Sequence, residues 1–470
     1  MKTRLESDSI GTREVPGDAY YGVQSLRAQE NFSITGHPMN QEFLRNLAQV
    51  KKAAAITNRN AGVLDSRRAE AIIKACEEVM EGDFEKEFIV DAIQGGAGTS
   101  ANMNMNEVVA NRANELLGGK PGDYSLVHPN DHVNMAQSTN DVIPTAGKMT
   151  VLTLLKPLLE ELGRLQEELS AKAVEFRDVI KMGRTQLQDA VPMMLGQSFQ
   201  AYADMVARDR KRIEQCRKEM TFVNLGGTAI GSAINTTDYY LHNVVPCLAK
   251  ISGLPLRQSE DLFDATENLD GFVAVSGVLK TCAVDLSKMC NDLRLLSSGP
   301  KTGLAEISLP ARQNGSSIMP GKVNPVIPEV VTQVAFLVIG HDTTITMAAE
   351  AGQLELNAFE PVLFYNLFES ITAMTGAVST LNDHCISGIS ANRERCKALL
   401  ESSAGIATAL NPYLGYKKAA EIAKRSVREN RSVREIVRDE KLMTDEQLDQ
   451  ILNPYAMVSA DRGMERKEAI

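Results

Sequence analysis

The sequence predicts a mostly α-helical protein built around long helices. Aromatic residues make up only 5% of the chain and Trp is absent, whereas Leu, Ala, Met, Glu, Lys and Arg are plentiful, a mixture that favours helices over sheets. Apolar residues also recur at helical spacing over three long stretches. Such helices expose too much apolar surface when alone, so we expect an extended helical bundle and association of several copies of the chain.

The clearest apolar stripe lies in the middle of the chain and is formed by leucines at steps of three and four: Leu155, Leu158, Leu162, Leu165 and Leu169. The stripe continues to Gly183, which predicts a helix far longer than the globular average of about 11 or 12 residues. Residues 196–222 and 328–350 repeat the pattern and predict two further long helices.

The composition of the segments predicts three domains. Residues 1–140 contain shorter helical segments and Gly-rich turns, which favours a separate N-terminal domain. Residues 141–395 carry the long stripes and form the central helical-bundle domain. Residues 396–470 form a small C-terminal domain of short charged helices, two of which start at Ser432 and Thr444 with the spacing of a capping box.

Charge and cysteine usage limit the classes of partner. Sixty acidic residues against fifty basic ones give a net charge of -10, which does not attract nucleic acid or an anionic membrane. The seven cysteines are scattered and lack metal-ligand spacing, as is typical of free thiols in a reducing compartment. The N-terminus has no apolar segment of signal-peptide length, and no run of about 18 or more apolar residues occurs elsewhere. We expect a cytoplasmic protein, in which an anionic substrate would have to be drawn by local groups.

Residues 315–325, Gly-Ser-Ser-Ile-Met-Pro-Gly-Lys-Val-Asn-Pro, contain the strongest chemical signal. Their prolines and glycines exclude regular helix or strand, so the stretch is predicted to be a loop between two regular elements. Ser316, Ser317 and Lys322 are its reactive polar groups, and a lysine near a serine favours an alkoxide over a hydroxyl. The alternative from spacing alone is a solvated Gly-Ser linker.

Three other segments are dense in small polar residues: 94–100, 137–141 and 183–190. The first could hold a carboxylate or phosphate if a helix begins at Thr99, although the segment taken alone favours an ordinary turn. The second is also typical of a helix cap. The third fits a turn between two long helices.

The histidines offer one pair at possible metal spacing, His128 and His132. Pro129 and Asn130 lie between them and favour a loop, so the sequence predicts no metal site. We expect no required cofactor, and the residues leave open whether a divalent metal activates the protein elsewhere.

Taken together, these segments resemble the aspartase/fumarase superfamily, whose most specific signature is the Gly-Ser-Ser-x-Met-Pro-x-Lys-x-Asn stretch at 315–324. The resemblance extends over nearly the whole chain, through residues 11–16, 96–100, 138–140, the Gly183 segment and 352–357. It implies a three-domain, mostly helical subunit that assembles into a tetramer around a core of about twenty helices. Each active site then draws on three subunits.

The resemblance also implies roles for individual residues. Ser316 matches the general base, Ser317 helps to hold the developing oxyanion, and Lys322 with Asn324 matches the site of the α-carboxylate. Hydroxyls and amides at six further positions match groups that hold the substrate's amino and carboxylate groups: Thr99, Ser138, Thr139, Asn140, Thr185 and Gln186.

The branch of the superfamily is suggested by three departures from fumarases. They are Gln186 where fumarases usually carry His, Gly-Gly-Ala-Gly-Thr at 95–99 in place of Thr-Gly-Ser-Gly-Thr, and Tyr20-Tyr21 where a Trp is usual. The expected reaction is therefore the reversible elimination of ammonia from L-aspartate to give fumarate through an aci-carboxylate. Two alternatives stay open, a class II fumarase acting on malate and a non-catalytic structural relative.

Overall fold

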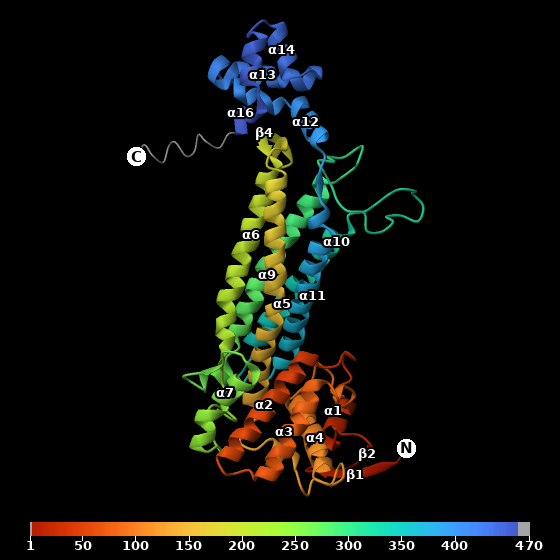
Figure 1. Ribbon diagram of the computed structural model, residues 1–470, viewed down its shortest axis with the longest axis vertical. Helices are drawn as coiled ribbons and strands as arrows, with labels where there is room; N and C mark the ends of the chain where they lie inside the picture. The colour runs from red at the N-terminus through yellow and green to blue at the C-terminus, as the bar shows by residue number, and fades with distance from the viewer. Residues whose placement is uncertain (1, 459–470) are drawn as a thin grey trace. The chain divides into compact units, whose positions relative to one another are not determined.

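The computed structural model describes residues 2–458 and is mostly helical, which confirms the predicted fold class (Figure 1). The α-helices are α1 Val23–Asn31, α2 Gln41–Asn60, α3 Ser66–Glu81, α4 Thr99–Leu116, α5 Thr139–Glu175, α6 Leu195–Cys216, α7 Asp238–Ser252, α8 Asp264–Glu267, α9 Asp270–Leu296, α10 Val326–Glu350, α11 Glu360–His384, α12 Arg393–Ser402, α13 Asn411–Glu429, α14 Val433–Asp439, α15 Asp445–Ile451 and α16 Pro454–Val458.

The strands are short and form two-stranded sheets. The antiparallel pairs are β1 Thr3–Asp8 with β2 Gly11–Pro16, β3 Ile180–Thr185 with β4 Gln188–Met194, and β7 Ile307–Ser308 with β8 Ser390–Ala391. The parallel pair is β5 Phe222–Val223 with β6 Arg257–Gln258. Short 3-10 helices lie at Glu85–Glu87, Arg217–Thr221, Ile386–Gly388 and Ala404–Leu410.

The chain divides into two compact units. The first contains residues 1–160, 209–284 and 334–376. Its core includes an aromatic cluster around Phe364 of α11, whose ring stacks on Phe368 and contacts Phe272 of α9 edge-on at 5.2 Å between centroids. Phe43 of α2 joins the cluster at 5.9 Å. Helices from the start, middle and end of the sequence therefore share one core in this unit.

The second unit contains residues 161–208, 285–333 and 377–470. Phe176, just after α5, packs edge-on against Phe199 of α6 at 5.1 Å, and the hydroxyl of Tyr202 donates to Asp292 of α9 at 2.9 Å. A separate apolar cluster joins the β3–β4 hairpin to helices α12–α15 through residues such as Met182 and Ile436. The capping boxes predicted at the starts of α14 and α15 are present, which confirms those helix starts.

The predicted continuation of the leucine-striped helix to Gly183 is wrong. The helix α5 ends at Glu175, and the chain enters β3 at Ile180. Likewise, the segment 183–190 is a β-hairpin and not a turn between helices. Tertiary packing explains both differences. Ile180 and Met182 are buried against the C-terminal helices, and this packing outweighs the helical periodicity of the isolated segment.

The prediction of a loop between His128 and His132 is also wrong. Residues Pro129–Val133 form a single π-helical turn, in which Pro129 occupies the first turn, where its missing N–H is not needed. The Nδ1 atom of His128 accepts the backbone N–H groups of Asn130 and Asp131. Among residues 2–458, no group of three or more His, Cys, Asp or Glu side chains is placed to hold a metal ion.

Candidate active site

Thr99 is the first residue of α4, so the helix start that an anion site at the Gly-rich segment requires is present. Gly98 caps the helix in the left-handed region, with φ of 85°. The Thr99 hydroxyl donates to the carbonyl of Gly96 at 2.7 Å, which fixes the turn, and the residue remains exposed. The positive end of the α4 dipole is therefore presented together with a hydroxyl, as an anion site requires.

Gly98 also allows α4 to approach α5 closely. A Cβ atom at this position would lie 2.9 Å from Cγ2 of Ile143 and would also need a strained positive φ. We expect Gly98→Ala to lower the free energy of unfolding by about 2–3 kcal/mol and to raise KM for the substrate, since it displaces Thr99. Urea unfolding and steady-state kinetics would measure the two effects.

The control for this variant is Gly118→Ala. Gly118 has φ of 89°, and a Cβ added there would meet no atom within 4 Å, so its substitution adds backbone strain without a steric contact. The double variant Gly98→Ala/Ile143→Val should recover part of the loss. Equal effects of the two single Ala variants would show that the Ile143 contact is unimportant.

Ser138, Thr139 and Asn140 form the start of α5. The Ser138 hydroxyl accepts the N–H of Asn140 at 3.2 Å, and the Ser138 N–H donates to Asp141 at 2.9 Å. The helix-cap interpretation is therefore correct, and the three side chains are still partly exposed. The carboxyl of Asp141 is buried, and burial raises its pKa to about 6 despite hydrogen bonds from Ser138, Gly226 and Thr228.

A buried polar network joins these two helix starts. Asn102 of α4 donates to the Thr139 hydroxyl at 3.2 Å, and its carbonyl oxygen accepts from Nζ of Lys51 at 2.6 Å. Lys51 also donates to Asn134 at 2.9 Å, an amide oxygen shared with Asn106. The segments of Thr99 and Thr139 are thus held in one arrangement within the first unit.

Sequence reasoning missed Lys51, although a signal was present. In α2 this lysine falls on the apolar stripe, at helical spacing from Leu44, Leu47 and Ala48. A cation on such a stripe indicates either a buried hydrogen-bonding role or a helix whose stripe is not a core face. Here Lys51 is fully buried, and burial lowers its pKa to about 7.

This lowered pKa predicts a pH dependence of stability. The folded pKa lies below the value of about 10.5 for an unfolded lysine, so the unfolded chain binds more protons between these values and stability rises with pH. From pH 7 to pH 9.5, the wild type should gain about 2–3 kcal/mol in free energy of unfolding relative to Lys51→Met. Lys52→Met, which removes a partly exposed lysine paired with Glu77, is the control. A wild-type gain no larger than that of Lys51→Met would contradict the expectation.

Thr185 and Gln186 lie at the exposed turn of the β3–β4 hairpin in the second unit. Gln186 and Leu187 form its two-residue loop, with φ of 53° and 62°, the conformation that matches the twist of hairpin strands. The strand before the turn is anchored by Arg184, whose guanidinium contacts Glu306 at 2.9 Å. The hairpin therefore presents both side chains from a fixed base.

The segment 309–325 has neither helix nor strand, as its prolines and glycines predict. The N–H of Gly315 donates to the carbonyl of Lys322 at 2.8 Å, and Asn324 Nδ2 donates to the carbonyl of Gly315 at 3.0 Å. A Cβ at Gly315 would lie 2.7 Å from the Lys322 carbonyl oxygen, so only glycine fits this closure. Ser316, Ser317, Lys322 and Asn324 are thereby brought together on one closed loop.

Ser316 occupies a distinctive position in this loop. Its Oγ accepts the backbone N–H groups of Ile318 at 3.2 Å and Met319 at 3.0 Å. Two donors aimed at one hydroxyl oxygen stabilise negative charge on that oxygen. The side chains of Ser317 and Lys322 are exposed and have no hydrogen bond or ion pair to another described residue, so they are available to a ligand.

The predicted residues thus form three clusters. Thr99 lies with Ser138–Asn140 in the first unit, whereas Thr185–Gln186 and the loop 315–324 belong to the second unit. Within the second unit, no hydrogen bond or ion pair among the described residues joins the hairpin turn to Ser316 or Lys322. Each cluster presents donors suited to a carboxylate, and the loop adds a serine with a stabilised oxygen.

Comparison with known proteins identifies the class. A family model described as "Lyase" matches residues 11–340, and one described as "Fumarase C C-terminus" matches residues 406–459. The chain belongs to the aspartase/fumarase superfamily of lyases. A curated relative from Bacillus sp, named aspartate ammonia-lyase, is 54% identical over 97% of both chains.

Two solved structures support the same conclusion. A fumarate lyase:delta crystallin from Brucella melitensis, crystallised with cobalt bound, has a TM-score of 0.93 at 50% identity and covers 97% of this chain and 99% of that one. A class II fumarase from Schistosoma mansoni has a TM-score of 0.94 at 34% identity, with the same coverage. The fold is therefore shared across the superfamily, while sequence identity is higher to the protein named for ammonia elimination.

Proposed function

We infer that this chain is an aspartate ammonia-lyase, a carbon–nitrogen lyase that converts L-aspartate reversibly to fumarate and ammonia. The observation that carries this inference is the 50–54% identity, over nearly the full length, to curated aspartate ammonia-lyases. The complete loop signature at 315–324 supports it, since that loop carries the chemistry in the family it resembles.

Ser316 is the proposed general base. Its alkoxide removes a proton from C3, the carbon beside the β-carboxylate, and the electron pair left behind forms a doubly charged aci-carboxylate. That species then expels ammonia from C2, which forms the double bond of fumarate and leaves Ser316 protonated. The N–H groups of Ile318 and Met319 support this role, because they stabilise the oxygen in its charged form.

The remaining polar residues hold the substrate. Lys322 and Asn324 bind the α-carboxylate, and Ser317 with the loop backbone donates to the growing oxyanion. Fixed hydroxyls and amides serve the charged intermediate without titrating, and they bind the amino and carboxylate groups from the other clusters: Thr99, Ser138, Thr139, Asn140, Thr185 and Gln186. The proposed chemistry runs on side chains and backbone dipoles, and we propose no cofactor requirement.

We further propose that the active protein is a homotetramer. The helix α10 supports this proposal. It contains an 18-residue stretch that is apolar enough in composition to span a membrane, yet only 33% of this stretch is buried within the subunit. Its exposed face includes Phe336 and Met347, which are 64% and 67% exposed. A second copy of the chain would cover such a surface in a soluble protein. Light scattering at micromolar concentration should report four copies, and a monomer would contradict the proposal.

A cytoplasmic location is also proposed. The seven cysteines are all free, and five of them are buried, which suits a reducing compartment where thiols persist. Membership of this lyase family also indicates that the protein acts on a small molecule.

The direct test of function is the stoichiometry of the reaction. Purified protein incubated with L-aspartate should give fumarate, detected by its ultraviolet absorbance, with an equal amount of ammonia. L-malate is the control, because a class II fumarase would convert malate and release no ammonia. Turnover of malate in preference to aspartate would overturn the assignment, and inactivity with both would favour a non-catalytic relative.

A further inference from the structure

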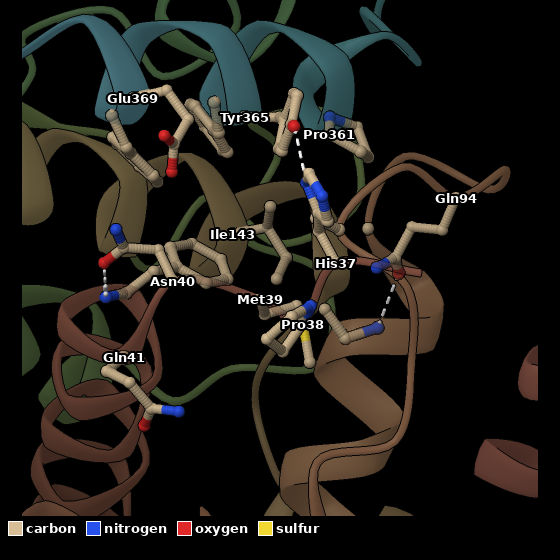
Figure 2. Close-up of a pocket in the computed structure, with 16 residues that line it drawn as sticks. His37, Pro38, Met39, Asn40, Gln41, Gln94, Ile143, Pro361, Tyr365 and Glu369 are labelled. Atoms are coloured by element: carbon tan, nitrogen blue, oxygen red, sulfur yellow. Dashed lines mark hydrogen bonds between the residues drawn. The ribbon is translucent and has the colours of Figure 1, made fainter. Parts of the chain in front are cut away.

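A cavity lies within the first unit and does not include any predicted site residue. Its volume is about 390 Å³, within the usual range of small-molecule sites. The walls come from the loop before α2, the segment before α4, and the helices α5 and α11 (Figure 2). Apolar side chains dominate the lining, among them Met39, Phe43, Ile143, Phe364 and Phe368.

Several polar side chains lie in the lining of this cavity. Figure 2 shows Glu369 and Asn40 on one side, His37 with Tyr365 nearer the middle, and Gln94 beyond them. Nδ1 of His37 and the hydroxyl of Tyr365 are 2.7 Å apart and satisfy each other. Asn40 Oδ1 accepts the N–H groups of Glu42 and Phe43 and caps α2. Glu369 has no lysine or arginine partner among residues 2–458.

The loop that forms one wall is fixed before any ligand arrives. Asp91 accepts the N–H groups of Ile34, Thr35 and Gly36 and the Thr35 hydroxyl, at 2.7 to 3.2 Å. Burial alone would raise the pKa of Asp91, but these hydrogen bonds and that from Ile93 lower it overall, so the carboxylate stays charged. A preformed wall reduces the entropy that binding must overcome.

The charge of the lining selects the ligand. Among the described residues, Glu369 is the only carboxylate that lines the cavity, and no lysine or arginine lines it. An anion such as aspartate or fumarate is therefore disfavoured, which argues against a second substrate site. An aromatic body fits the phenylalanine-lined centre, and a protonated amine fits the carboxylate end.

We propose that this cavity binds a small arylalkylamine, with its ring against the cluster of Phe43, Phe364 and Phe368 and its ammonium at the exposed carboxylate of Glu369. The site lies beside the proposed active site, because Gly98 and Ala101 also line it and precede or belong to the first turn of α4. Ile143, which limits the approach of Gly98, forms part of the same wall. A ligand bound in the cavity therefore affects the position of Thr99 and alters KM for L-aspartate.

The test uses 2-phenylethylamine and the full-length protein. Isothermal titration should give a dissociation constant on the order of 1 mM, with much weaker binding of the anion 3-phenylpropionate. Glu369→Gln should weaken the amine about tenfold and leave 2-phenylethanol unaffected. Ala92→Phe, which fills the cavity from a half-buried wall position, should abolish binding of both.

The outcomes separate cleanly. No binding to the wild type, equal binding of 3-phenylpropionate, or normal amine binding to Ala92→Phe would each overturn the proposal. A shift in KM that occurs in the wild type and is absent in Ala92→Phe would support the coupling to Thr99, and an unchanged wild-type KM would contradict it. The titration does not depend on catalysis, so it stands whatever the aspartate assay shows.

Discussion

Replacing Ser316 by alanine should lower kcat for L-aspartate about 10³-fold, since a positioned general base contributes about 10²–10⁴ in rate. Alanine cannot take the C3 proton, and it leaves the N–H groups of Ile318 and Met319 without the oxygen that they contact. Because this loop is exposed in the subunit, the fold should be unaffected. Fumarate formation under saturating substrate measures the loss, and circular dichroism checks the helices.

The matched control is Ser66→Ala. Ser66 is an exposed serine at the first residue of α3 and lies in neither the loop nor the other clusters. Its substitution should leave kcat within about twofold, as for surface changes in general. Should Ser316→Ala retain near-normal turnover, Ser316 would be removed from the mechanism.

The second large effect is expected from Lys322→Met. The variant keeps the length of the side chain and removes the ammonium, so under the proposed role it loses a charged hydrogen bond to the α-carboxylate. Such a bond contributes about 2–4 kcal/mol, which corresponds to a fall in kcat/KM of about 30- to 1,000-fold. We expect most of the loss in KM, because the α-carboxylate carries its charge before and after proton removal.

Lys301→Met is the control, since Lys301 is exposed shortly before the loop. It should leave kcat/KM unchanged within about twofold. If Lys322→Met gave the same KM as the wild type, the α-carboxylate would have to bind elsewhere.

The long helices could be predicted because they are periodic over many residues. The leucine stripe of α5 and the stretches that became α6 and α10 satisfy the helical spacing by themselves. Local chemistry also located the starts of α14 and α15 and the loop at 309–325, because caps, prolines and glycines act over a few neighbouring residues.

The features that sequence reasoning missed depend on distant partners. The β3–β4 hairpin replaces a predicted helix because Met182 packs against residues of the C-terminal helices, such as Ile422 and Ile436. The network around Lys51 joins positions 51, 102, 134 and 139, which no local pattern connects. For the same reason, motif spacing can identify candidate site residues, but whether these residues come together in one site depends on how several chains assemble.

The most direct measurement is complementation between two variants that the proposed roles make inactive, Ser316→Ala in the loop and Thr139→Val at the start of α5, each first assayed alone. If the clusters come from different subunits, mixed tetramers contain some sites with both native residues, and activity should recover to about a quarter of the wild-type value in a random mixture. Native mass spectrometry would verify that mixed tetramers form. Activity no higher than that of the separate variants, in a sample shown to contain mixed tetramers, would contradict a site shared between chains.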